Sequence, residues 1–329
     1  MSIDFFCCNT GEIPYYLPIY KHLKNAKMVV LSSRYDCKRT KRYLEKLNIP
    51  YQTFPSKDAT VVVATQIKKE PWMLERWKDI PKVRVIYSLC EKQRFHTTRF
   101  MVPFDLVLSP GPYTHKIALK YTKSVIVGYP RYDDYFNLLK REDVLKELNL
   151  NLDKNKKTIL YIPTSEEKKH RNSIANFYKE IIKLSEEYNV IFKPHIYTDY
   201  WEKNLINLFK NSEVKVVDAM TELDKLLIIS DIVIGDCQSG VPWECAIINK
   251  PCIACINKSD IPFEHLEVPI KDGEIMPIVK DPHKLKEAIK NINQNSFMYY
   301  KWLKKVCPYN DGKSGKMAAD AIMELVKNG

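Results

Sequence analysis

Residues 230–255 read SDIVIGDCQSGVPWECAIINKPCIAC, and the fold of the chain can be worked out from this stretch. An apolar run ends at Asp236, a small polar turn follows, and a second apolar run stops at Lys250 and Pro251. This order predicts a buried strand, a turn, a helix and a second buried strand. A helix that begins directly after a strand presents free backbone N–H groups, which is where many proteins hold phosphates. The turn after Asp236 is therefore the first candidate for an anion site.

Short β-rich runs alternate with longer helical patterns on both sides of this stretch. The alternation predicts parallel sheets covered by helices on both faces, and its restart after residue 157 predicts two doubly wound α/β halves. The polar, aperiodic segment 149–157 separates the halves, so we expect Rossmann-like domains over residues 1–148 and 149–329. The predicted strands are 3–7, 27–31, 60–64, 83–88, 106–108, 124–127, 158–162, 190–193, 214–217, 232–234 and 252–254. The predicted helices include 19–24, 40–47, 174–187, 201–211, 221–228, 242–247 and 282–291.

The composition, with 45% hydrophobic and 28% charged residues, is that of a soluble globular protein. We expect a cytoplasmic location, because no apolar stretch is long enough to cross a bilayer and the N-terminal residues lack a secretion-signal pattern. The net charge of +12 favours anionic partners such as nucleotides, phosphorylated polymers or an anionic membrane surface. No zinc-finger spacing or aromatic–basic pattern indicates nucleic-acid binding.

Nine cysteines, an odd number, suit reduced thiols better than a disulfide framework. Cys252 and Cys255 fall in a predicted buried strand, where we expect them to be small core residues. No acidic cluster suits a dedicated metal site, and we expect no cofactor.

Polar side chains follow four of the predicted strands, at the point where each strand ends. Ligands of open α/β sheets bind beyond these carboxyl ends, so we expect a site in a cleft between the two halves. The four turns supply arginine, threonine, lysine, histidine and serine, a set suited to a pyrophosphate and a sugar-like group. They are 128–133, 163–167, 193–195 and 235–240.

Motifs within and beyond these turns resemble the CDP-glycerol glycerophosphotransferase family of teichoic-acid and capsule-polymer biosynthesis. The resemblance runs from about residue 83 to the C-terminus and implies a GT-B fold, with an acceptor-side first domain and a nucleotide-donor-binding second domain. The motifs are Gly128-x-Pro-Arg-x-Asp133, Leu160-Tyr-Ile-Pro-Thr164, Lys193-Pro-His195, Leu223 to Asp236 with Ser239, and Asp311-Gly-Lys-Ser314.

Matched position by position, the resemblance implies a donor site. Ser239 corresponds to the second serine of the family's Asp-Tyr-Ser-Ser loop, which binds the diphosphate of the donor, and Asp236 holds the first position of that loop. Gln238 replaces the first serine, and Gly240 is an inserted residue. The other donor-side matches are Thr164 in the family's Ala-Pro-Thr loop, Lys193 as a phosphate-neutralising cation, Arg131 after the last N-terminal strand, and Glu244 at the family's acidic position.

The resemblance also implies catalytic residues. His195 stands near the histidine of the family's Lys-x-His-Pro motif, which is expected to assist at the transferred phosphate. The family's Trp-His-Gly motif, whose histidine is its expected general base, falls near residues 87–91, where this chain has no histidine. His96 and Glu91 are the remaining candidates for the base.

Structural roles are open for several of the same residues. Ser239 would serve as the N-cap of the following helix, His195 as a hydrogen-bonded structural histidine, and Arg131 as the partner of Asp133.

The resemblance implies a transferase that moves a glycerol-phosphate-like group from a CDP-activated donor to a hydroxyl of a glycan, teichoic-acid-like or lipid-linked acceptor, with release of CMP. The basic surface would hold it against the inner face of the cell membrane. Two alternatives stay open. One is a GT-B nucleotide-sugar enzyme, either a glycosyltransferase or a UDP-N-acetylglucosamine 2-epimerase, and the other is a non-catalytic module that binds a phosphorylated polymer.

Overall fold

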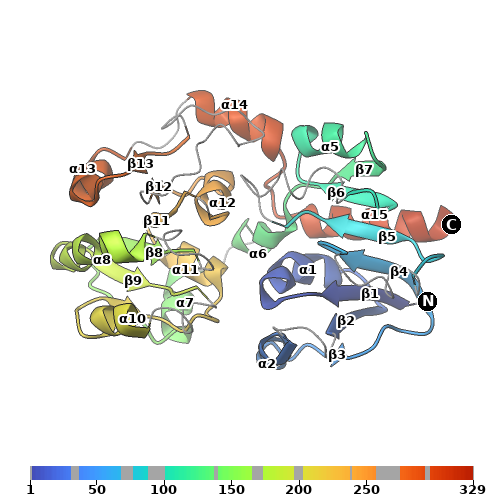
Figure 1. The fold of residues 1–329 in the computed structure, drawn as a ribbon, viewed down its shortest axis with the longest axis horizontal. Coiled ribbons are helices and arrows are strands. Elements are labelled where there is room, and N and C mark those ends of the chain that lie inside the picture. The colour runs from blue at the N-terminus through green and yellow to red at the C-terminus, as the bar shows by residue number, and fades with distance from the viewer. Residues whose placement is uncertain are drawn as a thin grey trace. The chain divides into compact units, whose positions relative to one another are not determined.

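The computed structural model describes residues 2–30, 37–67, 77–87, 101–136, 140–164, 173–195, 203–237, 239–256, 275–292 and 297–328 (Figure 1). Its contacts divide the chain into two compact units. Unit 1 comprises residues 1–87, 93–137 and 304–329, and unit 2 comprises residues 88–92 and 138–303.

This division differs from the single boundary expected after residue 148. Helix α7 (Arg141–Glu147) packs against helix α11 (Leu223–Ile229) and so joins unit 2. Helix α15 (Ser314–Asn328) packs against helix α1 (Ile13–Tyr20) and so returns to unit 1. A helical pattern in a sequence shows that one face of the helix is apolar, but not which element covers that face.

Unit 1 is built on a sheet of seven parallel strands in the order β3-β2-β1-β4-β5-β6-β7. The strands are β1 (Ser2–Cys7), β2 (Ala26–Val30), β3 (Tyr51–Gln52), β4 (Ala59–Ala64), β5 (Lys82–Val85), β6 (Leu106–Ser109) and β7 (Lys123–Ile126). Besides α1 and α15, the helices of this unit include α2 (Cys37–Lys46), α5 (Pro112–Ala118), α6 (Asp133–Phe136), and the 3-10 turns η1 (Thr10–Glu12) and η3 (Pro130–Tyr132).

Unit 2 is built on six parallel strands in the order β10-β9-β8-β11-β12-β13. The strands are β8 (Thr158–Ile162), β9 (Asn189–Phe192), β10 (Lys215–Val216), β11 (Ile232–Asp236), β12 (Cys252–Cys255) and β13 (Ile278–Val279). Besides α7 and α11, its helices include α8 (Ile174–Lys183), α10 (Lys203–Lys210), α12 (Val241–Ile247) and α13 (Leu285–Lys290), with the 3-10 turns η4 (Leu184–Glu186) and η6 (Pro282–Lys284). Helix α14 (Phe297–Val306) runs from unit 2 into unit 1.

The two sheets share one topology. In each, the first strand lies beside the fourth, and the strand order reverses between these two. This is the Rossmann order, which confirms the predicted doubly wound α/β fold. Such domains bind ligands at the switch point, beyond the carboxyl ends of the two strands, which are β1 and β4 in unit 1 and β8 and β11 in unit 2.

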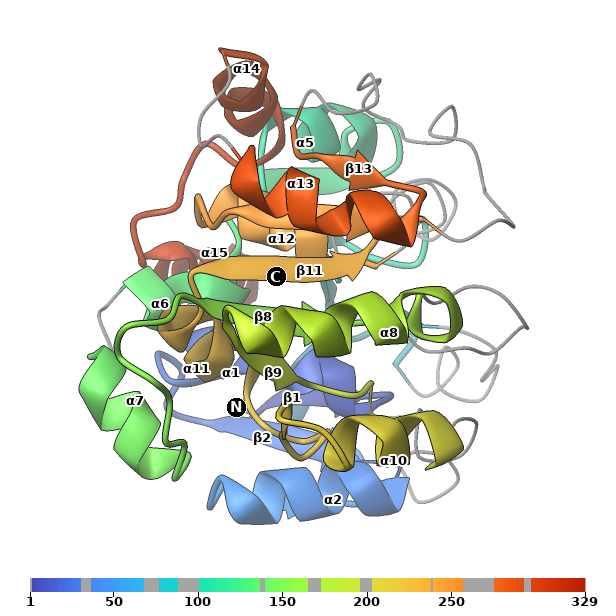
Figure 2. The ribbon, with the colours of Figure 1, turned by 90° about the vertical axis from the view of Figure 1, so that its left-hand side faces the viewer.

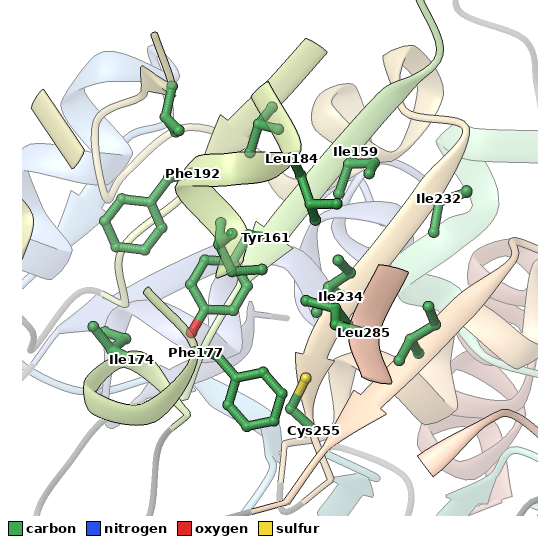
Figure 3. Close-up of a cluster of buried hydrophobic side chains, with 14 of the residues drawn as sticks. Ile159, Tyr161, Ile174, Phe177, Leu184, Phe192, Ile232, Ile234, Cys255 and Leu285 are labelled. Carbon is green, nitrogen blue, oxygen red and sulfur yellow. The ribbon is translucent and has the colours of Figure 1, made fainter. Parts of the chain in front are cut away.

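Apolar side chains from sheet and helices form the core of unit 2. Figure 2 shows α8, α10 and α13 along one face of the sheet, and the buried cluster between these layers is drawn in Figure 3. The rings of Phe192 and Phe209 stack with centroids 4.3 Å apart. Cys255 lies in the same cluster, and burial raises the pKa of its thiol well above the usual value. The cysteine therefore behaves as an apolar core residue, as expected.

Candidate functional site

Three of the four predicted turns lie at one edge of the second sheet. Strands β8, β9 and β11 are neighbours and run parallel, so their carboxyl ends meet at the same edge. Thr164 follows β8, Lys193 and His195 follow β9, and Ser239 follows β11. The fourth turn, with Arg131, belongs to unit 1. Gln238, Glu91 and His96 lie outside the described residues.

Asp236 ties the two strands of this switch point together. Its side chain is buried, with 1% of the residue exposed. One carboxylate oxygen accepts a hydrogen bond from the backbone N–H of Thr164 at 2.6 Å, and the other accepts one from the N–H of Ser173, which precedes α8, at 3.0 Å. Two charge-assisted bonds to backbone are strong and directional. The carboxylate thus fixes the turn after β8 and the start of α8 relative to β11.

Ser239 begins the turn into α12. Its backbone N–H donates to the carbonyl oxygen of Asp236 at 2.8 Å, and its hydroxyl accepts from the N–H of Val241 at 3.3 Å. The N-cap of α12 is Gly240, and no side chain caps the helix, so Ser239 does not take the N-cap role that the sequence left open; it lies one residue earlier and bonds the first helical N–H. A Cβ atom on Gly235 would lie 3.1 Å from the ring of Pro242, so glycine lets β11 and α12 approach closely.

Glu244 lies in the first turn of α12 and is buried, with 3% exposed. A carboxylate near a helix N-terminus interacts favourably with the exposed backbone N–H groups there. Trp243, beside it, donates its indole N–H to the carbonyl of Cys237 at 3.4 Å. The turn that carries Ser239 is thus bonded to Asp236 before it and, through the carbonyl of Cys237, to Trp243 after it.

Lys193 and His195 extend the edge at the end of β9. Lys193 is buried, and its ammonium group donates to the carbonyl oxygen of Ala219 at 2.7 Å. This bond joins the end of β9 to the segment that follows β10. His195 is partly exposed at the same edge. Lys193 and His195 thus follow the strand next to β8, and the Lys193 ammonium is directed toward the segment after β10.

The motif at residues 128–133 meets the start of α15 within unit 1. The carboxylate of Asp133 accepts from the backbone N–H groups of Ser314 at 3.2 Å and Gly315 at 2.5 Å. Gly128 has a φ of +86°, and a Cβ atom there would lie 2.3 Å from the hydroxyl oxygen of Ser314. Only glycine fits this backbone conformation and approach. Two motifs nearly 190 residues apart in sequence therefore form one junction, in which Asp133 caps α15.

Arg131 contacts aromatic rings at the same junction. Its guanidinium carbon lies 4.8 Å from the ring centroid of Tyr15 and 5.5 Å from that of Tyr132. A guanidinium stacks well on aromatic faces. The Arg131 side chain thus packs against the rings of Tyr15 and Tyr132.

A carboxylate at the switch point of unit 1, Glu12, was not among the residues predicted from the sequence. Glu12 is fully buried, and it accepts from the backbone N–H groups of Cys8 at 2.6 Å and Asn9 at 3.3 Å and from the hydroxyl of Thr65 at 2.6 Å. Burial raises its pKa to about 7, against the lowering effect of these bonds. The spacing Asn9-x-x-Glu12 has the form of a capping box and was the available signal.

Glu12 links two strand ends of unit 1 through hydrogen bonds, as Asp236 does in unit 2. It joins the turn after β1, at Cys8 and Asn9, to the turn after β4, at Thr65. Tyr16 adds a second link, since its hydroxyl donates to the carbonyl of Phe6 at 3.0 Å and accepts from the N–H of Thr65 at 2.9 Å. Each unit therefore has a buried carboxylate that spans its switch point.

Within the part of the chain that the structure describes, no group of three or more His, Cys, Asp or Glu side chains is arranged to hold a metal ion. Among those same residues, no helix combines the length and the apolar character needed to span a membrane.

Comparison with known protein families gives one match. The sequence model of the CDP-glycerol:poly(glycerophosphate) glycerophosphotransferases matches residues 88–324. A search of curated protein sequences gives no significant match.

Solved structures that resemble the whole chain include a teichoic acid polymerase and UDP-GlcNAc 2-epimerases. The wall teichoic acid polymerase TagF superposes with a TM-score of 0.68 at 18% identity, over 99% of this chain and 89% of that one. The UDP-GlcNAc 2-epimerase of Methanocaldococcus jannaschii gives 0.68 at 17% identity over 100% of both chains. A putative UDP-N-acetylglucosamine 2-epimerase of Listeria monocytogenes gives 0.69 at 14% identity, over 100% of this chain and 97% of that one. At these identities the likeness shows the fold, and it confirms the expected GT-B class.

Proposed function

The chain belongs to the CDP-glycerol:poly(glycerophosphate) glycerophosphotransferase family, and from that premise we propose that it transfers glycerol phosphate from CDP-glycerol to a hydroxyl of a teichoic-acid-like, glycan or lipid-linked acceptor and releases CMP. It is a transferase of this family. The observation that carries the proposal is the family match over residues 88–324, which includes the whole switch point of unit 2.

We propose that unit 2 binds the donor at this switch point. The hydroxyls of Thr164 and Ser239 lie on the two strand-end turns that the structure ties together through Asp236. Hydroxyl and backbone N–H groups on fixed turns are donors suited to a diphosphate. Glu244 and the backbone at Gly240 belong to the same proposed site, as do Gln238 and Lys193. Asp236 itself then acts by positioning, since backbone N–H groups engage both of its oxygens.

In the proposed reaction, the acceptor hydroxyl oxygen forms a bond to the β-phosphorus of the donor. The bond from that phosphorus to the bridging oxygen breaks, and its electron pair leaves with CMP. The hydroxyl proton passes to a general base, for which His96 and Glu91 remain the proposed residues. Positive charge or hydrogen bonds from His195, Lys193 and Arg131 would stabilise the charge that develops on the phosphoryl oxygens.

We further propose that unit 1 lies on an anionic membrane surface through a face formed by the end of α5 and strand β7, here called the α5–β7 face. Three exposed apolar residues on it, Leu119 (56% exposed), Tyr121 (43%) and Val125 (42%), lie in sequence among the exposed Lys116, Lys120 and Lys123. Residues 106–132 contain no Asp or Glu. Exposed apolar side chains between lysines suit a surface of anionic lipid headgroups.

A nucleotide-binding measurement tests the donor assignment. CDP-glycerol and CDP should raise the melting temperature of the protein, since a ligand that binds the native state stabilises it. The Ser239→Ala variant should lose most of this rise, whereas Ser185→Ala, which changes a serine on η4 in the same unit, should keep it. Release of CMP from CDP-glycerol in the presence of an acceptor then tests the reaction.

The nucleotide-sugar alternative makes the opposite prediction. If UDP and UDP-N-acetylglucosamine stabilise the protein and cytidine nucleotides do not, the donor assignment is wrong and the epimerase or glycosyltransferase reading replaces it. The family match favours the cytidine donor, because the sequence model that matches residues 88–324 is that of the CDP-glycerol transferases, whereas the teichoic acid polymerase and the epimerases share the fold at similarly low identity.

A further inference from the structure

Unit 1 contains a buried guanidinium whose two terminal nitrogens have no hydrogen-bond partner among the described residues. Arg84 lies on β5 and is fully buried. Its Nε–H donates to the carbonyl oxygen of Thr65 at 3.1 Å. Its Nη1 and Nη2 atoms, also buried, make no hydrogen bond in the described structure. Donors of a buried arginine are normally all engaged, so these two require an explanation.

The surroundings of Arg84 supply donors and rings but no counter-charge. Its guanidinium carbon lies 5.7 Å from the ring centroid of Phe104. Phe104 belongs to a buried cluster with Phe6 and Trp77, and the indole N–H of Trp77 is a further buried donor with no hydrogen-bond partner in the described part of the chain. Burial lowers the pKa of Arg84 to about 9, and no described carboxylate counters that shift.

The position of Arg84 places these donors near the ligand-binding edge of the sheet. Thr65, which accepts from Arg84, directly follows the last residue of β4, and its hydroxyl donates to Glu12 at the switch point. Arg84 pairs in register with Ala64 of β4 and Val107 of β6, so its side chain shares a face with the Phe6–Trp77 cluster. The two unpartnered nitrogens thus belong to a side chain that is anchored at the carboxyl end of β4.

We propose that Arg84 anchors an oxyanion site in unit 1, in which a phosphate group accepts hydrogen bonds from its two terminal nitrogens. A guanidinium offers two parallel N–H donors that match two oxygens of a phosphate, and such an anion is an acceptor that also balances the buried charge. Arg84 belongs to unit 1, whereas the residues of the proposed donor site belong to unit 2. The assignment of the oxyanion site to a phosphate of the polymer acceptor rests on the proposed function, whereas binding of free phosphate does not.

Titration of the wild-type full-length chain with inorganic phosphate is the first test. Calorimetry in a phosphate-free, sulfate-free buffer should show one site per chain. The melting temperature should rise by about 5 °C at 100 times the dissociation constant. Absence of saturable phosphate binding overturns the proposal whatever the variants do. Glycerol 3-phosphate in place of phosphate tests the acceptor as the source, and stronger binding of this monoester would support it.

The Arg84→Met variant tests the residue. It removes the buried charge at similar length, so without phosphate its melting temperature should equal or exceed that of the wild type, and phosphate should produce no rise. Arg42→Met, which changes an exposed arginine on α2 of the same unit, should keep the full phosphate response. Arg84→Lys keeps the charge but loses the paired donors, and should bind phosphate about tenfold more weakly.

Two results would overturn the assignment to Arg84. One is a phosphate response in Arg84→Met equal to that of the wild type, and the other is a melting temperature of Arg84→Met far below that of the wild type in phosphate-free buffer. A CDP response measured in parallel separates the two proposals. If CDP fails to stabilise the wild type while an Arg84-dependent phosphate response persists, the donor assignment fails and the oxyanion site stands.

Discussion

At the scale of single residues, the two switch points depend on carboxylates that never face solvent. Asp236, at the end of β11, accepts from two groups of the connection between β8 and α8, and Glu12 accepts from groups on the turns that follow the adjacent strands β1 and β4. A buried acceptor that is lost leaves its donors unsatisfied, which costs about 1–3 kcal/mol per group. Replacing either residue should therefore lower the free energy of unfolding and change the positions of the turns at the carboxyl ends of the strands.

The ends of β11 offer a matched pair for testing Asp236. Asp231, just before β11, accepts from the N–H of Thr158 at 2.6 Å. This bond links β11 to β8 at the amino ends of the two strands, opposite to the carboxyl ends where Asp236 lies. Asp236→Asn should lower the free energy of unfolding by about 1–3 kcal/mol, and Asp231→Asn should lower it by less, because 42% of the Asp231 side chain is exposed to solvent. Only Asp236→Asn should weaken CDP binding, by about tenfold, because it alone loosens the turns of the donor site. Denaturant unfolding and calorimetry measure the two effects, and equal CDP affinity in both variants would contradict a positioning role.

The raised pKa of Glu12 predicts a pH-dependent stability. Because its pKa is about 7 in the folded chain against 4.5 when exposed, its contribution is complete below pH 4.5 and is lost as pH rises through 7. The loss is about 3 kcal/mol, from 1.36 kcal/mol per pKa unit. Glu12→Gln removes the titrating group, so its stability relative to the wild type should increase between pH 5 and pH 8.

Urea unfolding across this pH range measures the difference. The control is Glu324→Gln, which changes an exposed glutamate on α15 of the same unit and should run parallel to the wild type. A constant difference between Glu12→Gln and the wild type at all pH values would show that Glu12 does not titrate there.

At the scale of elements, the helix α15 is fixed to unit 1 by one side chain and by close packing. Asp133 accepts from two backbone N–H groups at its first turn. A Cβ atom on Gly315 would lie 2.3 Å from the carbonyl oxygen of Pro18, so the helix and α1 meet at a glycine. Asp133→Ala should lower the free energy of unfolding by about 1–2 kcal/mol, the usual effect of removing a helix cap.

The neighbouring Asp134 provides the control for this cap. It pairs with Lys21 at 2.6 Å, and both side chains are about half exposed. Exposed ion pairs contribute little, so Asp134→Ala should change the free energy of unfolding by less than about 1 kcal/mol. Thermal or urea unfolding gives both values. Equal effects in the two variants would mean that Asp133 does not hold α15.

The sequence predicted most elements because fully buried parallel strands appear as short apolar runs. It missed β3 and β13, which have only two residues each and lie at sheet edges. It placed the first helix at 19–24, whereas α1 covers Ile13–Tyr20 with a proline in its first turn. A proline there has a suitable φ and lacks only an N–H that would be unpaired anyway, so it starts the helix.

The candidate site was predictable in its location but not in its contacts. The rule that ligands bind beyond strand ends located the turns with Thr164, Lys193, His195 and Ser239. The partners of Asp236 could not be inferred, because a bond from a side chain to the backbone of another turn depends on strand register and on the path of the loop. The lack of described partners for the terminal nitrogens of Arg84 could not be inferred either, because it too depends on which loops pack around the strand.

At the scale of the whole molecule, the net charge of +12 is available for attraction to anionic surfaces. On the α5–β7 face, changing Lys116, Lys120 and Lys123 together to glutamine should reduce binding to anionic phospholipid vesicles roughly 100-fold, at about 1 kcal/mol per lysine. Changing the exposed Lys24, Lys38 and Lys46 of the same unit removes equal charge and should have a much smaller effect.

Vesicle sedimentation at low and high salt measures this binding, which should weaken as salt screens the charges. Neutral phosphatidylcholine vesicles should bind both variants and the wild type equally weakly. If the two triple variants lose the same amount, the attraction is a property of the total charge and not of the α5–β7 face.

The return of α15 to unit 1 has a consequence for how the protein is made. Residues 1–87 emerge from the ribosome first, but the helix that covers α1 emerges more than 200 residues later. Nearly all of unit 2, residues 138–303, is synthesised in between and needs no later segment for its own sheet. The second unit can therefore complete its fold during translation while the first still has an uncovered apolar surface on α1. Of these two units, the one whose synthesis starts first is therefore completed second.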